Sequence, residues 1–418
     1  MLEMMGNNAR AASRQMAALT GKQKNQALLR LAELLWEKRA EIVAANQQDV
    51  DAGAKAGLTQ ALLDRLTLNE ARLTGVITEL KGVAELDDPA GQVFDSKEMS
   101  NGLKIHKQRV PLGVIAVIYE ARPNVTIDVA GLALKSGNAV ILRGGSETLR
   151  TNRSLVSVIR QALEESKLPV NAVQFIDSPD RALVSEMLKM HEDIDMLIPR
   201  GGAALHKFCR ENSQIPVMTG GIGICHLYVD DSADLDAALP LIQNAKIQRP
   251  SVCNALDTIL VSKAVAAEFI PRVVALLAAD GVSFRLDQSV YQMVNTHSLP
   301  NSQKAGSGDF DTEWLSLVLG IKVVEGLDEA AEHIAVHSTG HSDGILTRDN
   351  RNADRFIAAV DSAAVYVNAS TRYTDGAQLG LGAEVAISTQ RLHARGPMAL
   401  QELTIYKYVI IGDYHVRP

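Results

Sequence analysis

The stretch from Gly113 to Leu142 limits the possible folds more than any other part of the sequence. Gly113 to Tyr119 (GVIAVIY) is a short β-branched apolar run of the kind found in strands buried on both faces. A helical pattern follows from Val125 to Lys135, and a second apolar run covers Ala139 to Leu142. A strand, a helix and a strand at this spacing form a right-handed crossover between parallel strands. The pattern therefore predicts a doubly wound α/β domain.

The alternation of strands and helices continues along the rest of the chain, and a second α/β series starts near Ile224. Further strands are predicted at Val173 to Ile176, Met196 to Ile198, Val217 to Met218, Cys225 to Val229, Ala255 to Val261 and Leu403 to Ile411. Helices are predicted from a cap at Thr20, and at about Arg150 to Ser166, Leu205 to Glu211, Ala264 to Ala278, Glu329 to Val336 and Asn352 to Val360. A strand so close to the C-terminus needs another strand to pair with.

The charge and the cysteine content argue against several classes of protein. The net charge is -7, so no basic excess indicates a nucleic-acid or anionic-membrane partner. No apolar run reaches the length of about 18 residues that a membrane span requires, and the N-terminus lacks a secretion-signal pattern. Three cysteines in a long chain argue against a disulfide framework and fit a reducing compartment, so a cytoplasmic protein is predicted.

Two glycine-containing segments follow predicted strands, where a parallel sheet binds its ligands. Arg143-Gly144-Gly145-Ser146-Glu147 follows one strand, and Pro199-Arg200-Gly201-Gly202 follows another and opens a helix. Glycines let the backbone approach a ligand, and an arginine or a helix N-terminus can hold phosphate. Ordinary strand-to-helix turns would explain each segment equally well, but two at one sheet edge favour a nucleotide. No GxGxxG fingerprint is present in the sequence.

Cys253 lies in a polar turn, Arg249-Pro250-Ser251-Val252-Cys253-Asn254, between a helical segment and a strand. A free thiol has a pKa near 8.5, so only about 3% is thiolate at pH 7. A nearby arginine and a helix end could lower that pKa and make Cys253 a nucleophile. The alternative is a buried, inert cysteine, which is the commoner fate of a single thiol. Cys209 on a helix and Cys225 at the start of a strand are both typical of core positions.

Three histidines, His333, His337 and His341, recur at intervals of four residues. The first two could share a helix face and bind zinc, but Gly340 interrupts the helix and no third ligand is evident, so no metal site is predicted. The turn that contains His341 and Ser342 is better interpreted as a substrate-binding segment. Helix capping with a surface histidine is the alternative.

The order of these segments resembles the aldehyde dehydrogenase superfamily. Pro111-Leu112-Gly113-Val114, Arg122-Pro123-Asn124, Gly137-Asn138-Ala139-Val140 and Ser146-Glu147 are similar to its opening half. Ile215 to Gly221, followed by Asp234 to Ala238, resembles its domain junction, and Cys253 stands at its nucleophile. Within the superfamily, Val324 to Ile345 resembles a signature of the gamma-glutamyl phosphate reductase family, although Ala331 replaces a more usual branched aliphatic residue. The resemblance covers nearly the whole chain.

The resemblance implies a role for each matching residue. Cys253 would be the nucleophile, and the Asn124 amide would bind the oxyanion together with the backbone N–H of Cys253. The cofactor would be NADP(H), with Arg143 near its adenosine 2′-phosphate. The remaining cofactor contacts implied are Gly144, Arg200, Gly201, Gly202 and, by a looser alignment, Glu313. Arg122 and Arg249 flank the two catalytic residues and are substrate-binding candidates, although structural ion pairs would also explain them.

The resemblance also implies an architecture and a reaction. A Rossmann-type cofactor domain would comprise residues 1–95 and 112–217, an α/β catalytic domain residues 218–402, and a small oligomerisation arm residues 96–111 and 403–418. Met218 stands where aldehyde-oxidising members carry a glutamate base, which suits a reductase whose thioester must resist water. The implied reaction is NADPH-dependent reduction of L-glutamyl 5-phosphate to glutamate 5-semialdehyde in proline biosynthesis. A homo-oligomer is implied, and the kinase that makes the substrate is a further candidate partner.

Three rival functions remain open from the sequence. Another oxidoreductase of the superfamily could act on an acyl-CoA or a free aldehyde, although Met218 weighs against the oxidation of aldehydes. A non-enzymatic protein could use the same fold. A metal hydrolase could be built on the histidine cluster, and sensitivity to chelators would support that alternative.

Overall fold

The apolar runs of the sequence form the buried strands of two separate parallel sheets in the computed structural model, which describes residues 1–220, 222–294, 299, 302–417. The chain divides into two compact units. Unit 1 comprises Met1–Thr219, Gly380–Ala386 and Met398–Pro418, and unit 2 comprises Gly220–Leu379 and Ile387–Pro397. Gly221, expected at the domain junction, lies outside the described residues. No helix in the described ranges is both long and apolar enough to cross a membrane.

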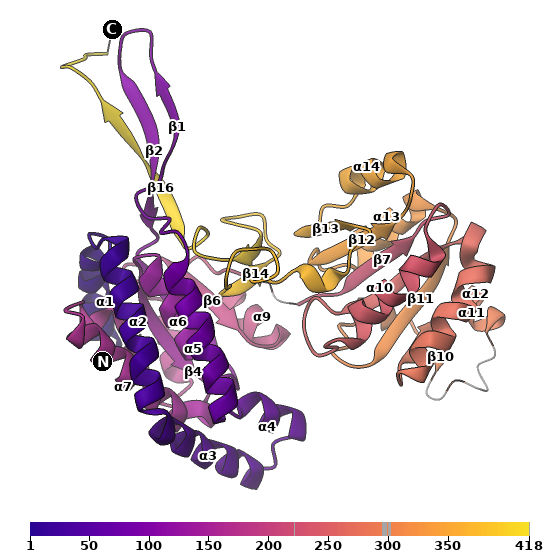
Figure 1. Ribbon diagram of the computed structural model, residues 1–418, viewed down its shortest axis with the longest axis horizontal. Coiled ribbons are helices and arrows are strands. Elements are labelled where there is room, and N and C mark those ends of the chain that lie inside the picture. Colours follow the sequence, from indigo (N-terminus) through magenta and orange to yellow (C-terminus); the bar gives the residue numbers. More distant parts are fainter. Residues whose placement is uncertain (221, 295–298, 300–301, 418) are drawn as a thin grey trace. The chain divides into compact units, whose positions relative to one another are not determined.

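The sheet of unit 1 is parallel throughout, and its strands are buried on both faces (Figure 1). Its spatial order is β5 (Val173–Phe175), β4 (Ala139–Gly144), β3 (Val114–Tyr119) and β6 (Met196–Arg200). Val114, Ala116 and Ile118 of β3 pack toward α1 (Leu2–Met16), α8 (Ala182–Met187) and α9 (Ala203–Asn212). The other layer contains α2 (Gly21–Glu37), α3 (Arg39–Lys55), α5 (Glu70–Glu85), α6 (Val125–Lys135) and α7 (Leu149–Glu165), with α4 (Gln60–Leu66) against α3. The predicted doubly wound domain is confirmed.

The sheet of unit 2 is also parallel among its described strands. In spatial order it contains β10 (Gln303–Lys304), β9 (Ser283–Leu286), β11 (Val318–Val324), β8 (Leu256–Ser262), β7 (Cys225–Val229), β12 (Ser342–Leu346) and β13 (Ala364–Val367). Its helices are α10 (Leu235–Ile247), α11 (Lys263–Ala279), α12 (Gln288–Met293), α13 (Leu327–His337) and α14 (Asn350–Ala359). One apolar core lies between the central strands and helices α10, α11 and α12. The second α/β series predicted from Ile224 is therefore confirmed.

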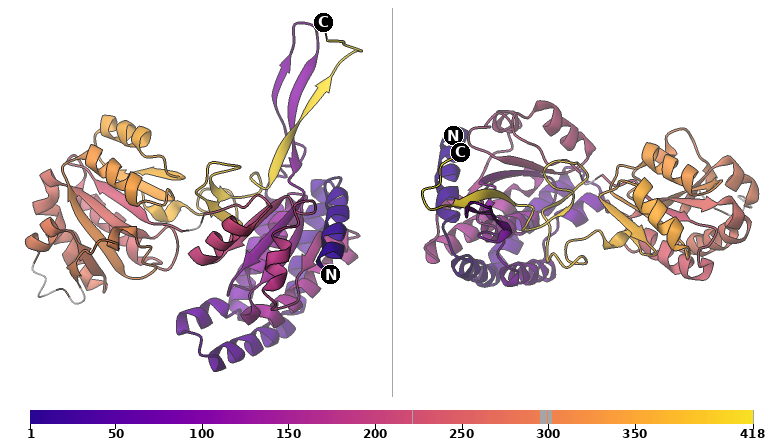
Figure 2. Two further views of the ribbon diagram at one scale, coloured as in Figure 1. Left: turned by 180° about the vertical axis from the view of Figure 1, so that it is seen from behind. Right: turned by 90° about the horizontal axis from the view of Figure 1, so that it is seen from above.

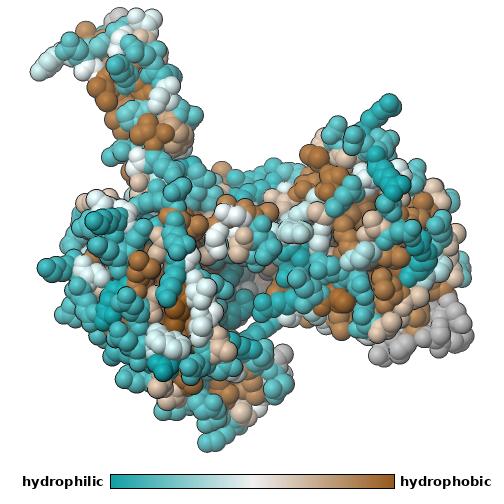
Figure 3. Space-filling view, viewed as in Figure 1, coloured by the Kyte–Doolittle hydropathy of each residue, from teal (hydrophilic) through white to brown (hydrophobic). Residues whose placement is uncertain are grey.

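A separate antiparallel sheet projects from unit 1 and joins two distant parts of the sequence. Its order is β1 (Val93–Glu98), β2 (Lys104–Pro111) and β16 (Thr404–Ile411), so the C-terminal strand finds its partner in β2. Figure 2 shows β16 and β2 side by side from a second direction. β16 is an edge strand, and brown atoms are visible on this three-stranded projection in Figure 3. The large apolar and aromatic side chains that β16 exposes are Ile405, Tyr406, Tyr408, Ile410 and Ile411.

The local signals in the sequence located most elements, and the exceptions have physical reasons. Thr20 caps α2 as predicted, in a reciprocal capping box with Gln23. Val217 and Met218 do not form a strand, because Val217 makes a single isolated parallel bridge to Leu197. Arg143 and Gly144, expected in a loop, end strand β4.

The expected domain boundaries differ from the compact units. Residues 218–219, 380–386 and 398–402 are predicted to lie in the catalytic domain but belong to unit 1. Gly382 accounts for part of this, because a Cβ atom there would lie 2.6 Å from Leu86, so the segment packs directly against the residue that follows α5. The boundary at residue 96 also falls inside β1 and divides one strand between two predicted domains.

Candidate active site

Cys253 is the most accessible of the three thiols. It lies in the turn between α10 and β8 and is half-buried, whereas Cys209 and Cys225 are buried. Burial raises the pKa of Cys209 to about 11, and burial followed by the charge of Asp343 raises the pKa of Cys225 well above its ordinary value. Since the thiolate is the nucleophile, those two thiols are inert. The prediction that they are core residues is confirmed.

The backbone carbonyl of Cys253 is enclosed by the segment that leads into β7. A Cβ atom added to Gly223 would lie 1.5 Å from the Cys253 carbonyl oxygen, so no other residue fits there without a backbone shift. The Cys225 thiol donates to the same oxygen at 3.2 Å. Glycine at position 223 is thus required by the close approach of two backbone segments.

Asn254 anchors the other side of the Cys253 turn. Its side-chain amide donates to the carbonyl oxygens of Arg372 at 3.3 Å and Thr374 at 2.9 Å. Its own carbonyl accepts from the Thr371 hydroxyl at 2.7 Å. The nucleophile is therefore held by contacts from β7 and from the 3₁₀ turn η5 (Thr371–Tyr373), which come from distant parts of the chain.

Glu313 contacts the same segment as the cysteine turn. Its Oε1 accepts from the backbone N–H of Gly223 at 2.9 Å, and burial raises the pKa of the carboxyl group. Thr339 holds the flanking residues, since it donates to the Ile222 carbonyl and accepts from the Ile224 N–H. The structure thus brings Glu313 into the neighbourhood of Cys253 within unit 2, while its predicted contact with a cofactor ribose stays a prediction.

Arg372 is a candidate that sequence reasoning missed. Burial lowers the pKa of its guanidinium, as does the positive charge of Arg249, whereas the charges of Asp375 and Cys253 raise it. Arg372 donates to the Gln248 side chain at 3.0 Å. It therefore lies, with the exposed Arg249, in the electrostatic environment of the nucleophile. Residue 372 is more than a hundred positions along the chain from Cys253, so no local pattern indicated it.

Asn124 belongs to unit 1 and stands at the N-terminus of α6 without capping it. Its Nδ2 donates to Oδ2 of Asp128 at 2.9 Å, which leaves a second N–H on the same amide available to another acceptor. Burial raises the pKa of the Asp128 carboxyl to about 7, and Glu79 on α5 adds to the increase. The i,i+4 spacing of the pair on a helix could have indicated Asp128 from sequence.

A cavity of about 950 Å³ opens at the carboxyl ends of β3 and β4 in unit 1. One wall is apolar and comes from α3 and α4, including Ala52, Ala56 and Leu62. Charged side chains also line the cavity, among them Glu120, Arg143, Glu147, Arg150 and Arg181. Apolar walls with a few placed charges are typical of small-molecule sites.

The predicted cofactor residues contribute to this cavity unequally. Arg143 lines it, but the residue is only 8% exposed, and its guanidinium donates to the carbonyl oxygens of Gly144 at 2.8 Å and Pro179 at 3.2 Å. Gly144 instead allows close packing, since a Cβ there would lie 2.1 Å from the Asn152 amide. Arg143 thus donates to two backbone carbonyls while its buried Nε has no partner among the described residues, and its predicted contact with a cofactor stays a prediction.

The second glycine segment adjoins the cavity through Glu120. Arg200 ends β6, and the N–H of Gly202 donates to Glu120 Oε2 at 3.2 Å. A Cβ on Gly201 would lie 2.4 Å from the same carboxylate oxygen. The carboxylate therefore rests at the N-terminus of α9, where the helix dipole favours negative charge.

His341 and Ser342, predicted to bind substrate, are buried in unit 2. His341 Nδ1 bonds with Ser342 Oγ at 2.8 Å, and Ser342 Oγ bonds with Thr374 Oγ1 at 2.6 Å. Burial lowers the pKa of His341 to about 4, so it is neutral near pH 7. Both residues are fully buried, and His341 Nε2 has no partner among the described residues, so their predicted contact with substrate stays a prediction.

The rings of the other two histidines lie in contact at a tilt of 38°. The rings of His333 and His337 have centroids 4.3 Å apart, and His337 Nδ1 bonds with Asp311 Oδ1 at 2.7 Å. Burial lowers the pKa of His333 to about 2. Within the part of the chain that the structure describes, no three His, Cys, Asp or Glu side chains are grouped to hold a metal ion.

Comparisons with known proteins agree with this architecture. The model of the aldehyde dehydrogenase family matches residues 2–297. The gamma-glutamyl phosphate reductase of Cronobacter sakazakii is 56% identical over 418 residues, covering 100% of both chains. The crystal structure of the gamma-glutamyl phosphate reductase of Thermotoga maritima is 47% identical, with a TM-score of 0.96 and 100% of both chains covered.

More distant structures share the fold alone. An engineered glycolyl-CoA reductase with bound NADP+ is 16% identical, with a TM-score of 0.69, and covers 98% of this chain and 96% of its own. The relatives at 56% and 47% identity match this chain from end to end. A shared fold alone does not produce sequence identity this high. The chain belongs to the gamma-glutamyl phosphate reductases of the aldehyde dehydrogenase family and is an oxidoreductase.

Proposed function

We propose that the protein reduces L-glutamyl 5-phosphate to L-glutamate 5-semialdehyde and phosphate with NADPH, through a thioester on Cys253, as a step of L-proline biosynthesis. The observation that carries the proposal is the setting of Cys253, an accessible thiol on a turn held by Gly223, Cys225 and Asn254. A nucleophile needs a fixed position, because displacing a reacting group by about 1 Å can lower the reaction rate about 10²-fold.

In the proposed first step the Cys253 thiolate attacks the γ-carbonyl carbon of the acyl phosphate. The oxyanion that forms accepts hydrogen bonds from the Asn124 amide and the backbone N–H of Cys253. In other enzymes the removal of one such donor costs roughly 3 kcal/mol of transition-state stabilisation. The carbon–oxygen bond to phosphate then breaks, phosphate leaves with the electron pair, and an acyl thioester remains on Cys253.

The cavity of unit 1 supports a nicotinamide dinucleotide, the cofactor class of the aldehyde dehydrogenase family. Its apolar wall suits an adenine ring, and its arginines suit phosphate groups. When bound, NADPH would supply the hydride that reduces the thioester. The thiohemiacetal anion then collapses, the aldehyde leaves, and Cys253 returns as the thiolate.

The absence of a general base at Met218 supports reduction over hydrolysis. Met218 is buried, and its backbone N–H donates to the Leu197 carbonyl at 2.8 Å. A methionine cannot remove a proton from water, so the thioester would persist until hydride transfer. This favours an acyl-phosphate reductase over an enzyme that oxidises free aldehydes to acids.

The substrate's charges suggest further contacts. Arg122, Arg249 and Arg372 are proposed to bind the phosphate and α-carboxylate groups, since a guanidinium fork matches both. Arg249 and Arg372 already affect each other electrostatically. The phosphate group would first be held and then released beside these side chains.

The sheet of β1, β2 and β16 supports assembly into a homo-oligomer. Its edge strand β16 exposes large apolar side chains, which usually mark a contact with another chain. A cytoplasmic location is proposed from the three free cysteines. The kinase that makes the short-lived acyl phosphate is a further proposed partner.

The reverse reaction tests the proposal, because the acyl phosphate is unstable. Glutamate 5-semialdehyde, NADP+ and inorganic phosphate are mixed with the protein, and NADPH formation is followed. We expect NADPH only when phosphate is present and only with Cys253 intact. Equal NADPH formation without phosphate would make water the acceptor and contradict the argument from Met218. No reaction with folded protein would refute the substrate assignment.

A further inference from the structure

Three arginines line the cavity of unit 1, and their guanidinium groups are occupied to different degrees. Each terminal nitrogen of Arg143 donates one hydrogen bond, to the Gly144 and Pro179 carbonyl oxygens. Arg150 forms an ion pair with the buried Asp49 at 3.1 Å. Arg181 is exposed, and among the described residues its guanidinium makes neither a hydrogen bond nor an ion pair. Arg181 therefore offers its whole donor fork to a ligand.

Arg143 and Arg181 lie close enough for their charges to interact. Burial lowers the pKa of Arg143, the charges of Glu147 and Asp180 raise it, and the charge of Arg181 lowers it. Two guanidinium groups thus act on one another without an ion pair between Arg181 and any described carboxylate. A dianion placed beside both would be attracted by both, and the partial removal of water would strengthen that attraction.

Glu147 is the acid that could instead favour a neutral ribose hydroxyl. In dinucleotide-binding folds a carboxylate near this strand end binds the 2′-hydroxyl of NAD, and an arginine accommodates the 2′-phosphate of NADP. Here Glu147 Oε1 accepts from the backbone N–H of Ala121 at 2.7 Å. A Cβ on Gly145 would lie 2.1 Å from the same oxygen, so this glycine lets the carboxylate fold back against the chain. The Glu147 carboxylate is thus hydrogen-bonded to the backbone, whereas the Arg181 guanidinium is available to a ligand.

We infer that Arg181 recognises the 2′-phosphate of NADP(H), the contact that the family resemblance implies for Arg143. The inference rests on the proposed use of a nicotinamide dinucleotide and adds the residue that selects NADP over NAD. Arg143 acts as a positioning residue, because its bond to the Pro179 carbonyl holds the segment that carries Arg181 two residues later. A planar guanidinium fork matches a phosphate group in a way that an ammonium does not.

The test is calorimetric titration of the full chain with two fragments, 2′,5′-ADP and 5′-AMP, which differ by the 2′-phosphate. We expect the unmodified protein to bind 2′,5′-ADP more tightly. Arg181→Ala should weaken 2′,5′-ADP by about 10- to 100-fold, the size of a charge-assisted hydrogen bond, and leave 5′-AMP almost unchanged. The affinity of Arg181→Lys for 2′,5′-ADP should lie between those of the unmodified protein and Arg181→Ala, since lysine keeps the charge but lacks the planar guanidinium fork.

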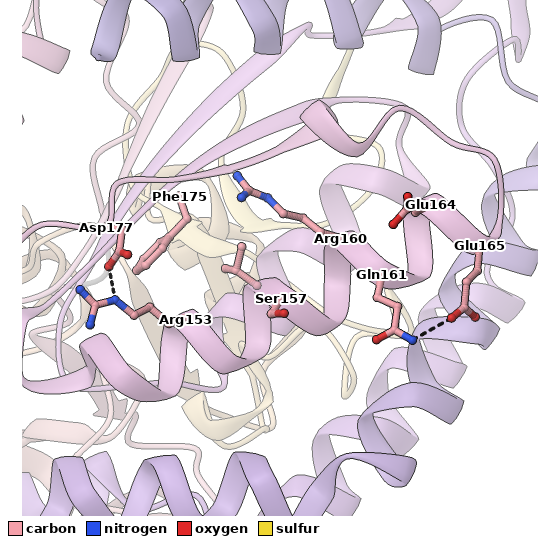
Figure 4. Close-up of a pocket in the computed structure, with 9 residues that line it drawn as sticks. Arg153, Ser157, Arg160, Gln161, Glu164, Glu165, Phe175 and Asp177 are labelled. Carbon is pink, nitrogen blue, oxygen red and sulfur yellow. Dashed lines mark hydrogen bonds and ion pairs between the residues drawn. The ribbon is translucent and has the colours of Figure 1, made fainter.

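Arg160→Ala is the matched control. Arg160 projects from α7 into a different cavity of unit 1, of about 810 Å³, shown in Figure 4. Like Arg181 it has no carboxylate partner among the described residues, and its Nε donates to the Val173 carbonyl at 3.4 Å. The control removes the same charge from the same unit, so it separates a specific contact from a general loss of positive potential. Both fragments should bind this variant as they bind the unmodified protein.

Several outcomes would overturn the inference. Unchanged 2′,5′-ADP affinity in Arg181→Ala would exclude the contact, and equal weakening of both fragments would place Arg181 on another part of the nucleotide. Equal affinity of the unmodified protein for both fragments would exclude a 2′-phosphate site altogether. Weaker 2′,5′-ADP binding in Arg160→Ala would indicate that the 2′-phosphate binds in the cavity on α7 instead. No glutamyl substrate is present in these titrations, so a failed assay of acyl-phosphate reduction leaves their result standing.

Discussion

The nucleophile and the oxyanion donor proposed for this enzyme are held in different ways. The turn of Cys253 in unit 2 is fixed by a close backbone approach at Gly223, a thiol hydrogen bond from Cys225 and three hydrogen bonds involving Asn254. None of these contacts requires an ionised group. Among the described residues, the side chain of Asn124 in unit 1 is oriented by its hydrogen bond to the titratable Asp128.

This difference predicts which of the two residues responds to pH and to single substitutions of its neighbours. Geometry held by several neutral contacts tolerates the loss of one, because the others still define the turn. Geometry held by one charge-assisted hydrogen bond depends on the protonation of the acceptor, since such bonds are roughly twice as strong as neutral ones. Variants on the two sides should therefore behave differently.

The largest effect is expected for Cys253→Ala. Without the thiolate no thioester forms, and turnover should fall by at least about 10³-fold, as for other covalent nucleophiles. The measurement is NADPH formation from semialdehyde and phosphate. Cys209→Ala is the matched control, because Cys209 is buried on α9 with a raised pKa and should not affect turnover. Comparable activity of the two variants would remove Cys253 from the mechanism.

The next largest effect is expected for Gly223→Ala. The added Cβ would lie 1.5 Å from the Cys253 carbonyl oxygen, so the backbone of one segment must move. A displacement of about 1 Å at the nucleophile should lower kcat roughly 10²-fold. The control is Gly82→Ala on α5, where a Cβ meets nothing within 4 Å. That variant should keep full activity and gain about 0.5–1 kcal/mol of stability from better helix propensity, measured by denaturant unfolding.

The sequence located the two sheets because each strand and helix has a local signature. The apolar run of β3 and the helical pattern of α6 specify their own structure, and Cys253 was correctly placed in the turn before β8. Glycine spacing also indicated where β4 and β6 end, although not what the glycines do.

The remaining features depend on contacts between distant residues. His341 and Ser342 read as an exposed turn, but the pairing of β12 between β7 and β13 buries them. The occupation of Arg143 depends on Pro179, and Arg372 approaches the cysteine turn from beyond β13. A single sequence does not reveal such pairings, because they are set by tertiary packing.

Asp128→Asn should have a moderate effect that depends on pH. Burial and Glu79 raise the pKa of Asp128 to about 7, so the carboxylate that binds the Asn124 amide most strongly forms only above that pH. In the unmodified protein kcat should therefore rise as the pH increases through 7. In Asp128→Asn this rise should disappear, and kcat above pH 7 should be about tenfold lower than in the unmodified protein. KM should change less than kcat, since the contact acts on the oxyanion.

The neighbouring charge gives this prediction its control. Glu79→Gln removes the carboxylate that raises the Asp128 pKa, so the rise in kcat should move to lower pH while its height is kept. The stability of the fold should change with pH in the direction opposite to kcat. A carboxyl whose pKa is raised in the folded state binds its proton more tightly there, so stability falls as pH rises from about 4 to about 7. Asp128→Asn should therefore unfold at higher denaturant than the unmodified protein at pH 8, and an unchanged pH profile in both variants would separate Asp128 from Asn124.

The smallest effect is expected for Cys225→Ala. The substitution removes the thiol that donates to the Cys253 carbonyl at 3.2 Å, but a thiol is a weak donor and Gly223 and Asn254 still hold the turn. Turnover should fall by less than about threefold, within the range of one weak hydrogen bond, and should not gain a pH dependence. If kcat instead falls as far as in Asp128→Asn, the cysteine turn depends on one contact just as Asn124 does, and the contrast between Cys253 and Asn124 is wrong.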